Sequence, residues 1–103
     1  MSGRSAPMIQ VDPGELHVPP SRLQGADPAK LARQIAKYGN GIDGIPLLEI
    51  VRGKDGHLRI NDGVTRTTRV AKLLPGQTLP AVVIHDLPNL DVTRFPKIKE
   101  LLP

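Results

Sequence analysis

The sequence contains no cysteine, and its aromatic residues are limited to Tyr38 and Phe95. Without cysteine the chain has no disulfide framework, no thiolate metal site and no thiol nucleophile. With so few aromatic side chains it also lacks the base-stacking surface of RNA-recognition and OB-type modules. These absences exclude thiol chemistry and argue against sequence-tolerant binding of single strands.

Long apolar runs are missing as well. The longest span only a few residues, far short of the roughly 20 that a membrane-spanning helix needs. The first residues, MSGRSAP, lack the apolar core of a signal peptide. We therefore expect no membrane partner, a flexible N-terminus over residues 1–7 and a cytoplasmic site of action.

Positive charge is in excess. Lys and Arg number 14 against 10 Asp and Glu, which gives a net charge of +4. A basic chain of this kind favours an anionic partner, and nucleic acid, a nucleotide phosphate or an acidic protein would each suit it. A chain of 103 residues has room for one modest core and for no separate regulatory domain.

Turn residues divide the chain into helix-like and strand-like segments. Asp27 and Pro28 are typical of a helix start, and Gly39 is placed to end that helix. Two β-rich segments, PLLEIVRG and HLRIN, flank a hairpin turn at residues 54–56. A second helix is predicted over about residues 64–74, before Pro75 and Gly76.

The remaining segments complete the predicted fold. TLPAVVIHD indicates a buried strand, the arm that starts at residue 8 is extended or rich in turns, and FPKIKELLP suits one or two helical turns. The sequence thus predicts a compact α+β domain over residues 8–86 with a small mixed sheet and two main helices. Residues 87–103 are expected to form a short helical tail packed on that domain.

The stretch RINDGVTRTTRVA passes from a predicted strand that ends at Asn61 into the second helix. Gly63 leaves the first free N–H groups of that helix open to a close ligand, which predicts an anion site. Arg66 is the preferred side chain for this site because it aligns with Val70 and Leu73 on a flank that turns toward the protein. Asn61 and the hydroxyls of Thr65 and Thr67 are further candidate ligands of the phosphate.

The other basic residues of the helices form a predicted outer surface. Thr65, Arg69 and Lys72 share a helix face without apolar residues, so we expect that face to be solvated. The residues expected to contact a nucleic acid are Lys30, Arg33, Lys37, Arg69 and Lys72. The alternative is that these side chains are simply solvated, that Arg66 is structural and that Asp62 only caps the second helix.

Acids and bases near the predicted site are few. Asp62, His17 and Glu49 are the candidate catalytic residues, and phosphoryl transfer would also require electrostatic stabilisation and, in most cases, Mg²⁺. The three histidines show no metal-ligand spacing, and no dense carboxylate cluster is visible for two metals. We therefore predict no protein-built metal site.

The order of these segments resembles the ParB N-terminal and sulfiredoxin-like family over residues 8–86. The resemblance rests on PPSRL, the glycine loop before IPLLEIV, the hairpin to LRINDG, and the run GVTRTTRVAKLLPG before LPAVVI. It implies that Gly63 and Arg66 hold nucleotide phosphates and that Arg22 of PPSRL belongs to the same site. It also implies ATP or CTP as ligand and nuclease or phosphoryl-transfer activity.

Two departures from the family narrow this implication. Val64 occupies the position of the reactive cysteine of sulfiredoxins, which excludes their redox chemistry. Threonines replace the arginine run of the chromosome-partitioning branch, and a second nucleotide motif is missing, which argues against a CTP switch. Similar short domains resemble the C-terminal modules of secreted polymorphic toxins, which implies secretion within a larger toxin and a cognate immunity protein. The alternative is a non-enzymatic module that binds DNA or a protein.

Overall fold

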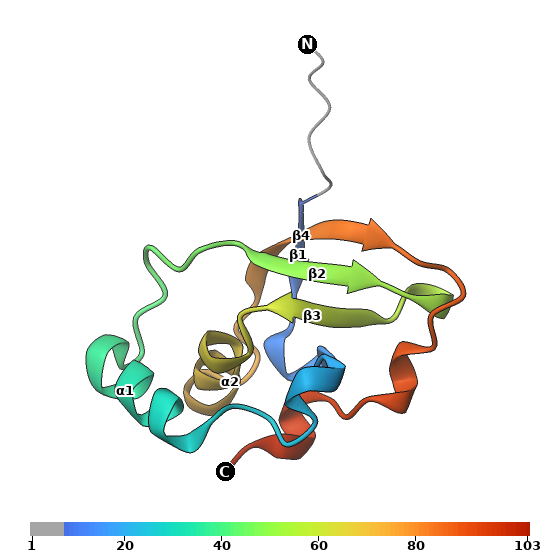
Figure 1. Cartoon of the computed structure of the whole chain (residues 1–103). Helices are drawn as coiled ribbons and strands as arrows, with labels where there is room; N and C mark the ends of the chain where they lie inside the picture. The colour runs from blue at the N-terminus through green and yellow to red at the C-terminus, as the bar shows by residue number, and fades with distance from the viewer. Residues whose placement is uncertain (1–7) are drawn as a thin grey trace.

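The computed structural model describes residues 8–103 and has an α+β fold built on a four-stranded mixed sheet (Figure 1). The sheet order is β1 (Met8–Val11), β4 (Leu79–Asp86), β2 (Leu48–Arg52) and β3 (Leu58–Asp62). β1 and β3 run antiparallel to their neighbours, whereas β2 and β4 are parallel. The predicted fold class is confirmed. The prediction of a flexible N-terminus concerns residues outside the described part of the chain.

The two main helices begin and end where the sequence predicts. α1 (Pro28–Tyr38) starts after Asp27, whose carboxylate accepts a hydrogen bond from the backbone N–H of Lys30 at 2.9 Å. It ends at Gly39, whose φ of 53° lies in the region that favours glycine. α2 (Val64–Leu73) ends within one residue of the prediction.

The β2–β3 hairpin and α2 place the predicted site at one edge of the sheet. β2 and β3 are joined through η3 (Lys54–Gly56), a short 3₁₀ turn. α2 then carries the chain from the edge strand β3 to β4, so that β4 can pair in parallel with β2. α1 and α2 lie on the same side of the sheet, and the turn between β3 and α2 faces α1 (Figure 1).

The core fills the space between the sheet and α2. Ile50 and Ile60 of the sheet and Val70 of α2 are fully buried there. At 25 cal/mol per Å² of apolar surface, each such side chain contributes about 1.5–3 kcal/mol when it is removed from water. The alternating burial of β4 follows from this one-sided packing, because every second side chain faces the core.

The C-terminal tail contributes to the same core. It forms two 3₁₀ turns, η4 (Val92–Arg94) and η5 (Ile98–Leu101). Ile98 is fully buried, and its backbone N–H donates to the carbonyl of Leu16 at 2.9 Å. Within residues 8–103, none of the helices combines the length and the apolar character needed to span a membrane.

Candidate anion-binding site

The first turn of α2 is open to a ligand. Its N-cap is Gly63, with φ 111° and no side chain to cap the helix. The N–H groups of the first helical residues, Val64 to Arg66, have no intrahelical partner because of helix geometry. Asp62 does not act as the cap, so that alternative is wrong: its side chain is 72% exposed and lies 3.9 Å from Nη2 of Arg66. The helix start thus presents unpaired N–H groups and positive dipole potential.

A cavity of about 280 Å³ lies in front of this turn. It is formed by the loop before α1, by α1 itself and by the turn between β3 and α2. Its lining residues are Pro19, Ser21, Arg22, Lys30, Gln34, Asn61, Asp62, Gly63, Val64, Thr65 and Arg66. Three of them are cationic and one, Asp62, is acidic, so the cavity has the charge that an anion requires.

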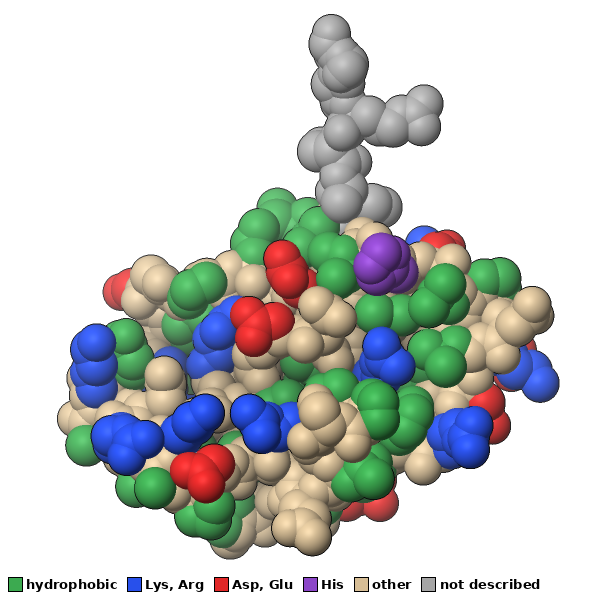
Figure 2. All heavy atoms as spheres, viewed as in Figure 1, with side chains coloured by type: hydrophobic (Ala, Val, Ile, Leu, Met, Phe, Trp, Pro, Cys, Tyr) green, Lys and Arg blue, Asp and Glu red, His purple; other side chains and the backbone are tan. Residues whose placement is uncertain are grey.

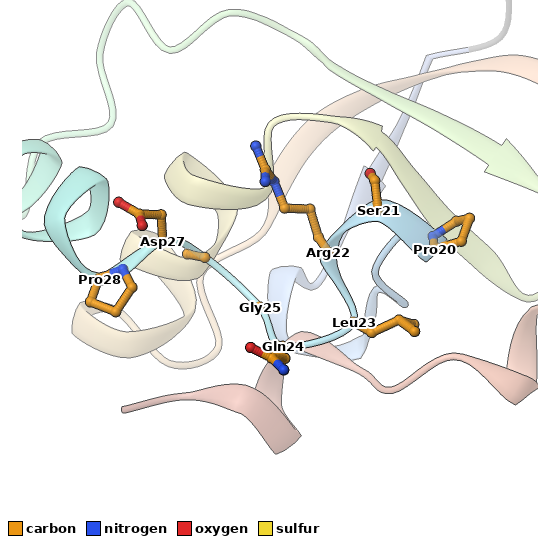
Figure 3. Close-up of a pocket in the computed structure, with 9 residues that line it drawn as sticks. Pro20, Ser21, Arg22, Leu23, Gln24, Gly25, Asp27 and Pro28 are labelled. Carbon is orange, nitrogen blue, oxygen red and sulfur yellow. The ribbon is translucent and has the colours of Figure 1, made fainter.

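Arg22 reaches the site from η2 (Pro20–Arg22), a short 3₁₀ turn. Its side chain extends from η2 toward the turn between β3 and α2 (Figure 3). Arg22 also lines a larger open hollow of about 490 Å³, which is formed by the continuous segment 20–28. Arg22 is the one cation in that second lining, so the charges converge on the smaller cavity.

Arg66 lies against the turn itself. Its side chain is 21% exposed, and its Nε atom is buried without a hydrogen-bond partner among the described residues. The guanidinium carbon is 3.0 Å from the point that a Cβ on Gly63 would occupy. Since Asp62 is a distant and exposed partner, Arg66 retains donors for an anion at the helix start.

Lys30 and Gln34 also line the cavity, although neither was predicted to belong to the phosphate site. Lys30 was expected on the outer surface. The available signal was their i, i+4 spacing, which places both side chains on one face of α1. That this face turns toward the start of α2 follows from the tertiary packing.

Thr67 is not a phosphate ligand, contrary to prediction. It is fully buried, and its hydroxyl donates to the carbonyl of Gly63 at 2.6 Å. Thr68 makes the corresponding bond to the carbonyl of Val64 at 2.7 Å. Both hydroxyls therefore satisfy the helix backbone one turn earlier. Thr65, which is half-buried, lines the cavity and remains a candidate donor.

Arg69 is not part of a solvated face, and the prediction that it contacts nucleic acid from the surface is wrong. It is 1% exposed, and its Nη1 donates to the carbonyls of Gly39 and Gly41 at 2.7 and 2.8 Å. Burial lowers the pKa of its guanidinium, while Tyr38 acts in the opposite direction. Arg69 is buried because the end of α1 and the following loop pack on its side chain.

The other predicted surface residues are exposed. Lys30, Arg33 and Lys37 follow one another along α1, and Lys and Arg side chains form a row across that end of the molecule (Figure 2). They line a shallow hollow of about 250 Å³ together with Gln34, Tyr38 and Thr65. Lys72 is exposed as well, but its Nζ donates to the carbonyl of Pro103 at 3.1 Å, away from this row.

The three candidate catalytic residues do not all line the candidate site. Asp62 lines the 280 Å³ cavity, but His17 and Glu49 do not. His17 is buried between β3 and the tail, where its Nδ1 donates to the carbonyl of Phe95 at 2.6 Å. Glu49 is exposed and lies opposite Asp62 in the β2–β3 ladder. Of the three, Asp62 is therefore the one that lines this cavity.

A magnesium site built by the protein does not fit this geometry. Within the described residues, no three His, Asp or Glu side chains gather in positions that could hold a metal ion. Asp62 is the single carboxylate of the cavity lining. A Mg²⁺ ion at this site would have to bring most of its oxygen ligands from a phosphate and from water.

Comparison with known proteins adds no assignment. No protein-family model matches this chain, and no curated protein sequence matches it either.

Proposed function

We propose that this chain is a ParB-like domain that binds a phosphate-bearing ligand, a nucleotide or a nucleic acid, at the turn between β3 and α2. The observation that carries the proposal is the convergence of Arg22, Lys30 and Arg66 on the uncapped start of α2. Phosphate oxygens accept strong hydrogen bonds from free backbone N–H groups and from guanidinium groups.

The family part of the proposal rests on the order of elements. A proline-rich arm, a helix, a hairpin, a second helix and a final strand follow one another as in the family that the sequence resembles. Gly63 and Arg66 occupy the positions where that family holds phosphates. ATP and CTP are accordingly the first nucleotides to test.

Binding without turnover is favoured over catalysis. His17 and Glu49 lie outside the lining of the cavity, so Asp62 is the remaining general-base candidate at the site. Nuclease or phosphoryl-transfer activity, with action in the cytoplasm as part of a secreted toxin, is the second candidate function. Its supporting observation is the position of Asp62 beside Arg66.

Titration calorimetry tests the proposal. Wild-type protein is titrated with ATP, CTP, a DNA duplex and RNA, each with and without Mg²⁺ and at two salt concentrations. Nucleic-acid affinity should fall steeply with salt in proportion to the phosphates neutralised, whereas mononucleotide affinity should fall less. Absence of binding to all four ligands would refute the proposal. Product analysis of the same mixtures decides between binding and turnover.

A further inference from the structure

Arg69 is a buried cation without an acidic partner in the described part of the chain. One nitrogen, Nη1, donates to the carbonyls of Gly39 and Gly41, and Nε is buried without any hydrogen-bond partner. None of the ion pairs among residues 8–103 includes Arg69. Burying a charge without a counter-ion is costly. The carbonyl end of α1 compensates part of this cost but leaves the guanidinium with unused donors.

A smaller cavity, of about 140 Å³, opens beside this guanidinium. Its walls are formed by Gln34, Tyr38, Asp43, Gly44, Ile45, Pro46, Arg66 and Arg69. Water occupies about 30 Å³ per molecule in the liquid, so the cavity has room for a small anionic group. Asp43 belongs to the same lining but forms no ion pair with either arginine.

The two cavities are neighbours that share residues. Gln34 and Arg66 line both the 280 Å³ cavity and the 140 Å³ cavity. Arg66 and Arg69 are three positions apart on α2, a spacing at which Cβ atoms lie about 5–6 Å apart. A ligand with two linked anionic groups can therefore contact Arg66 with one group and Arg69 with the other.

Building on the proposed function, we infer that the site accepts the diphosphate end of a ligand. The inner phosphate lies at Gly63 and Arg66, and the terminal phosphate enters the 140 Å³ cavity beside the guanidinium of Arg69. A phosphate group supplies the several acceptor oxygens that a guanidinium fork requires. Because Arg69 is 1% exposed, this cavity suits the end of a phosphate chain and not an internal phosphodiester.

The binding of inorganic pyrophosphate and orthophosphate tests the inference without a nucleoside. Wild-type protein should bind pyrophosphate about tenfold or more tightly than orthophosphate, the effect of at least one additional charge-assisted hydrogen bond. For the same reason ADP, which has a diphosphate, should bind more tightly than AMP. In the Arg69→Met variant the ratio of pyrophosphate to orthophosphate affinity should fall to about one-tenth of the wild-type ratio.

Two further variants separate ligand binding from folding. Arg94→Met removes the same charge from an exposed position outside both cavities and should keep the wild-type ratio. Arg69→Lys retains a buried charge and should give an intermediate ratio if Arg69→Met does not fold. Thermal melts establish that each variant is folded before it is titrated.

The outcomes distinguish the two proposals. Loss of the pyrophosphate preference in Arg69→Met or Arg69→Lys, with orthophosphate binding retained, supports the diphosphate site. An unchanged preference in a folded Arg69 variant overturns it and leaves the phosphate site at Gly63 and Arg66 standing. Wild-type protein that binds orthophosphate but shows no preference for pyrophosphate also overturns the diphosphate site alone. Wild-type protein that binds neither anion contradicts the proposed function itself.

Discussion

The guanidinium of Arg66 lies so close to Gly63 that a Cβ on this glycine would be 3.0 Å from Arg66 Cζ. A methyl group of Leu48 would lie at the same distance on that side. Gly63 also has a φ of 111°, which L side chains rarely adopt. The turn and the cation at the helix start therefore depend on the same residue.

Gly63→Ala should destabilise the protein by about 1–3 kcal/mol, the usual cost of a strained backbone conformation, and should weaken phosphate binding. Gly76→Ala is the matched control, because Gly76 has φ 86° but no atom within 4 Å of the added Cβ. Urea denaturation of both variants separates backbone strain from the contact with Arg66. Equal destabilisation and equal phosphate affinity in the two variants would show that this contact is unimportant.

Asp62→Asn should leave stability within about 0.5 kcal/mol of wild type, because the side chain is exposed and does not cap α2. Phosphate affinity should rise by about 0.2–1 kcal/mol, since an exposed like charge beside the anion is removed. Calorimetry measures both affinities. A tenfold loss of affinity would instead show that the carboxylate contacts the ligand, directly or through a cation.

Thr65→Val and Thr67→Val should affect different properties, the first phosphate affinity and the second folding stability. Thr65 lines the cavity, so its variant should bind phosphate more weakly by about 0.5–1.5 kcal/mol. Thr67 is buried against the Gly63 carbonyl, so its variant should lose about 1 kcal/mol of folding stability with little change in affinity. Thermal melts and phosphate titrations of both variants check this contrast. Loss of affinity in Thr67→Val alone would contradict the assignment.

Glu15 makes the attachment of the tail sensitive to acid. Hydrogen bonds from Lys97 and then from Lys99 lower the pKa of its carboxyl from 4.5 to about 2. Because this pKa is lower in the folded protein than in the unfolded chain, the ionised carboxylate stabilises the fold at pH values above 4.5. This contribution is lost as the pH falls from 4.5 toward 2. Glu15→Gln should therefore lose less stability than wild type over that interval in denaturant melts. Parallel pH profiles for the two proteins would refute the coupling.

The helix boundaries and the turn that opens α2 were predictable because the signals are local. Asp27, Pro28 and Gly39 bracket α1 by capping and by backbone preference. Gly63 marks the turn that opens α2 in the same way. Such signals depend on neighbouring residues, so one sequence is sufficient to locate them. The role of β1 was less clear, because its pairing partner β4 lies about 70 residues farther along the chain.

The errors concern polar residues whose partners come from distant segments. Arg69 was assigned to a solvated face because only apolar residues were used to identify the buried face of the helix. Its acceptors, the carbonyls of Gly39 and Gly41, are 30 and 28 residues away. His17 was assigned a catalytic role, yet its acceptor at Phe95 lies 78 residues away. Thr67 is different, because back-bonding to the carbonyl one turn earlier is a local signal.

The most direct test of an anion site at the start of α2 is an amide chemical-shift titration of ¹⁵N-labelled protein with inorganic pyrophosphate. We expect the largest saturable shifts at the backbone amides of Gly63, Val64, Thr65 and Arg66. Arg66→Ala should weaken pyrophosphate binding by about 1.5–3 kcal/mol, whereas Arg94→Ala should not. Shifts that are absent at these four amides, or that gather instead around Lys97 and Lys99, would contradict an anion site at the start of α2.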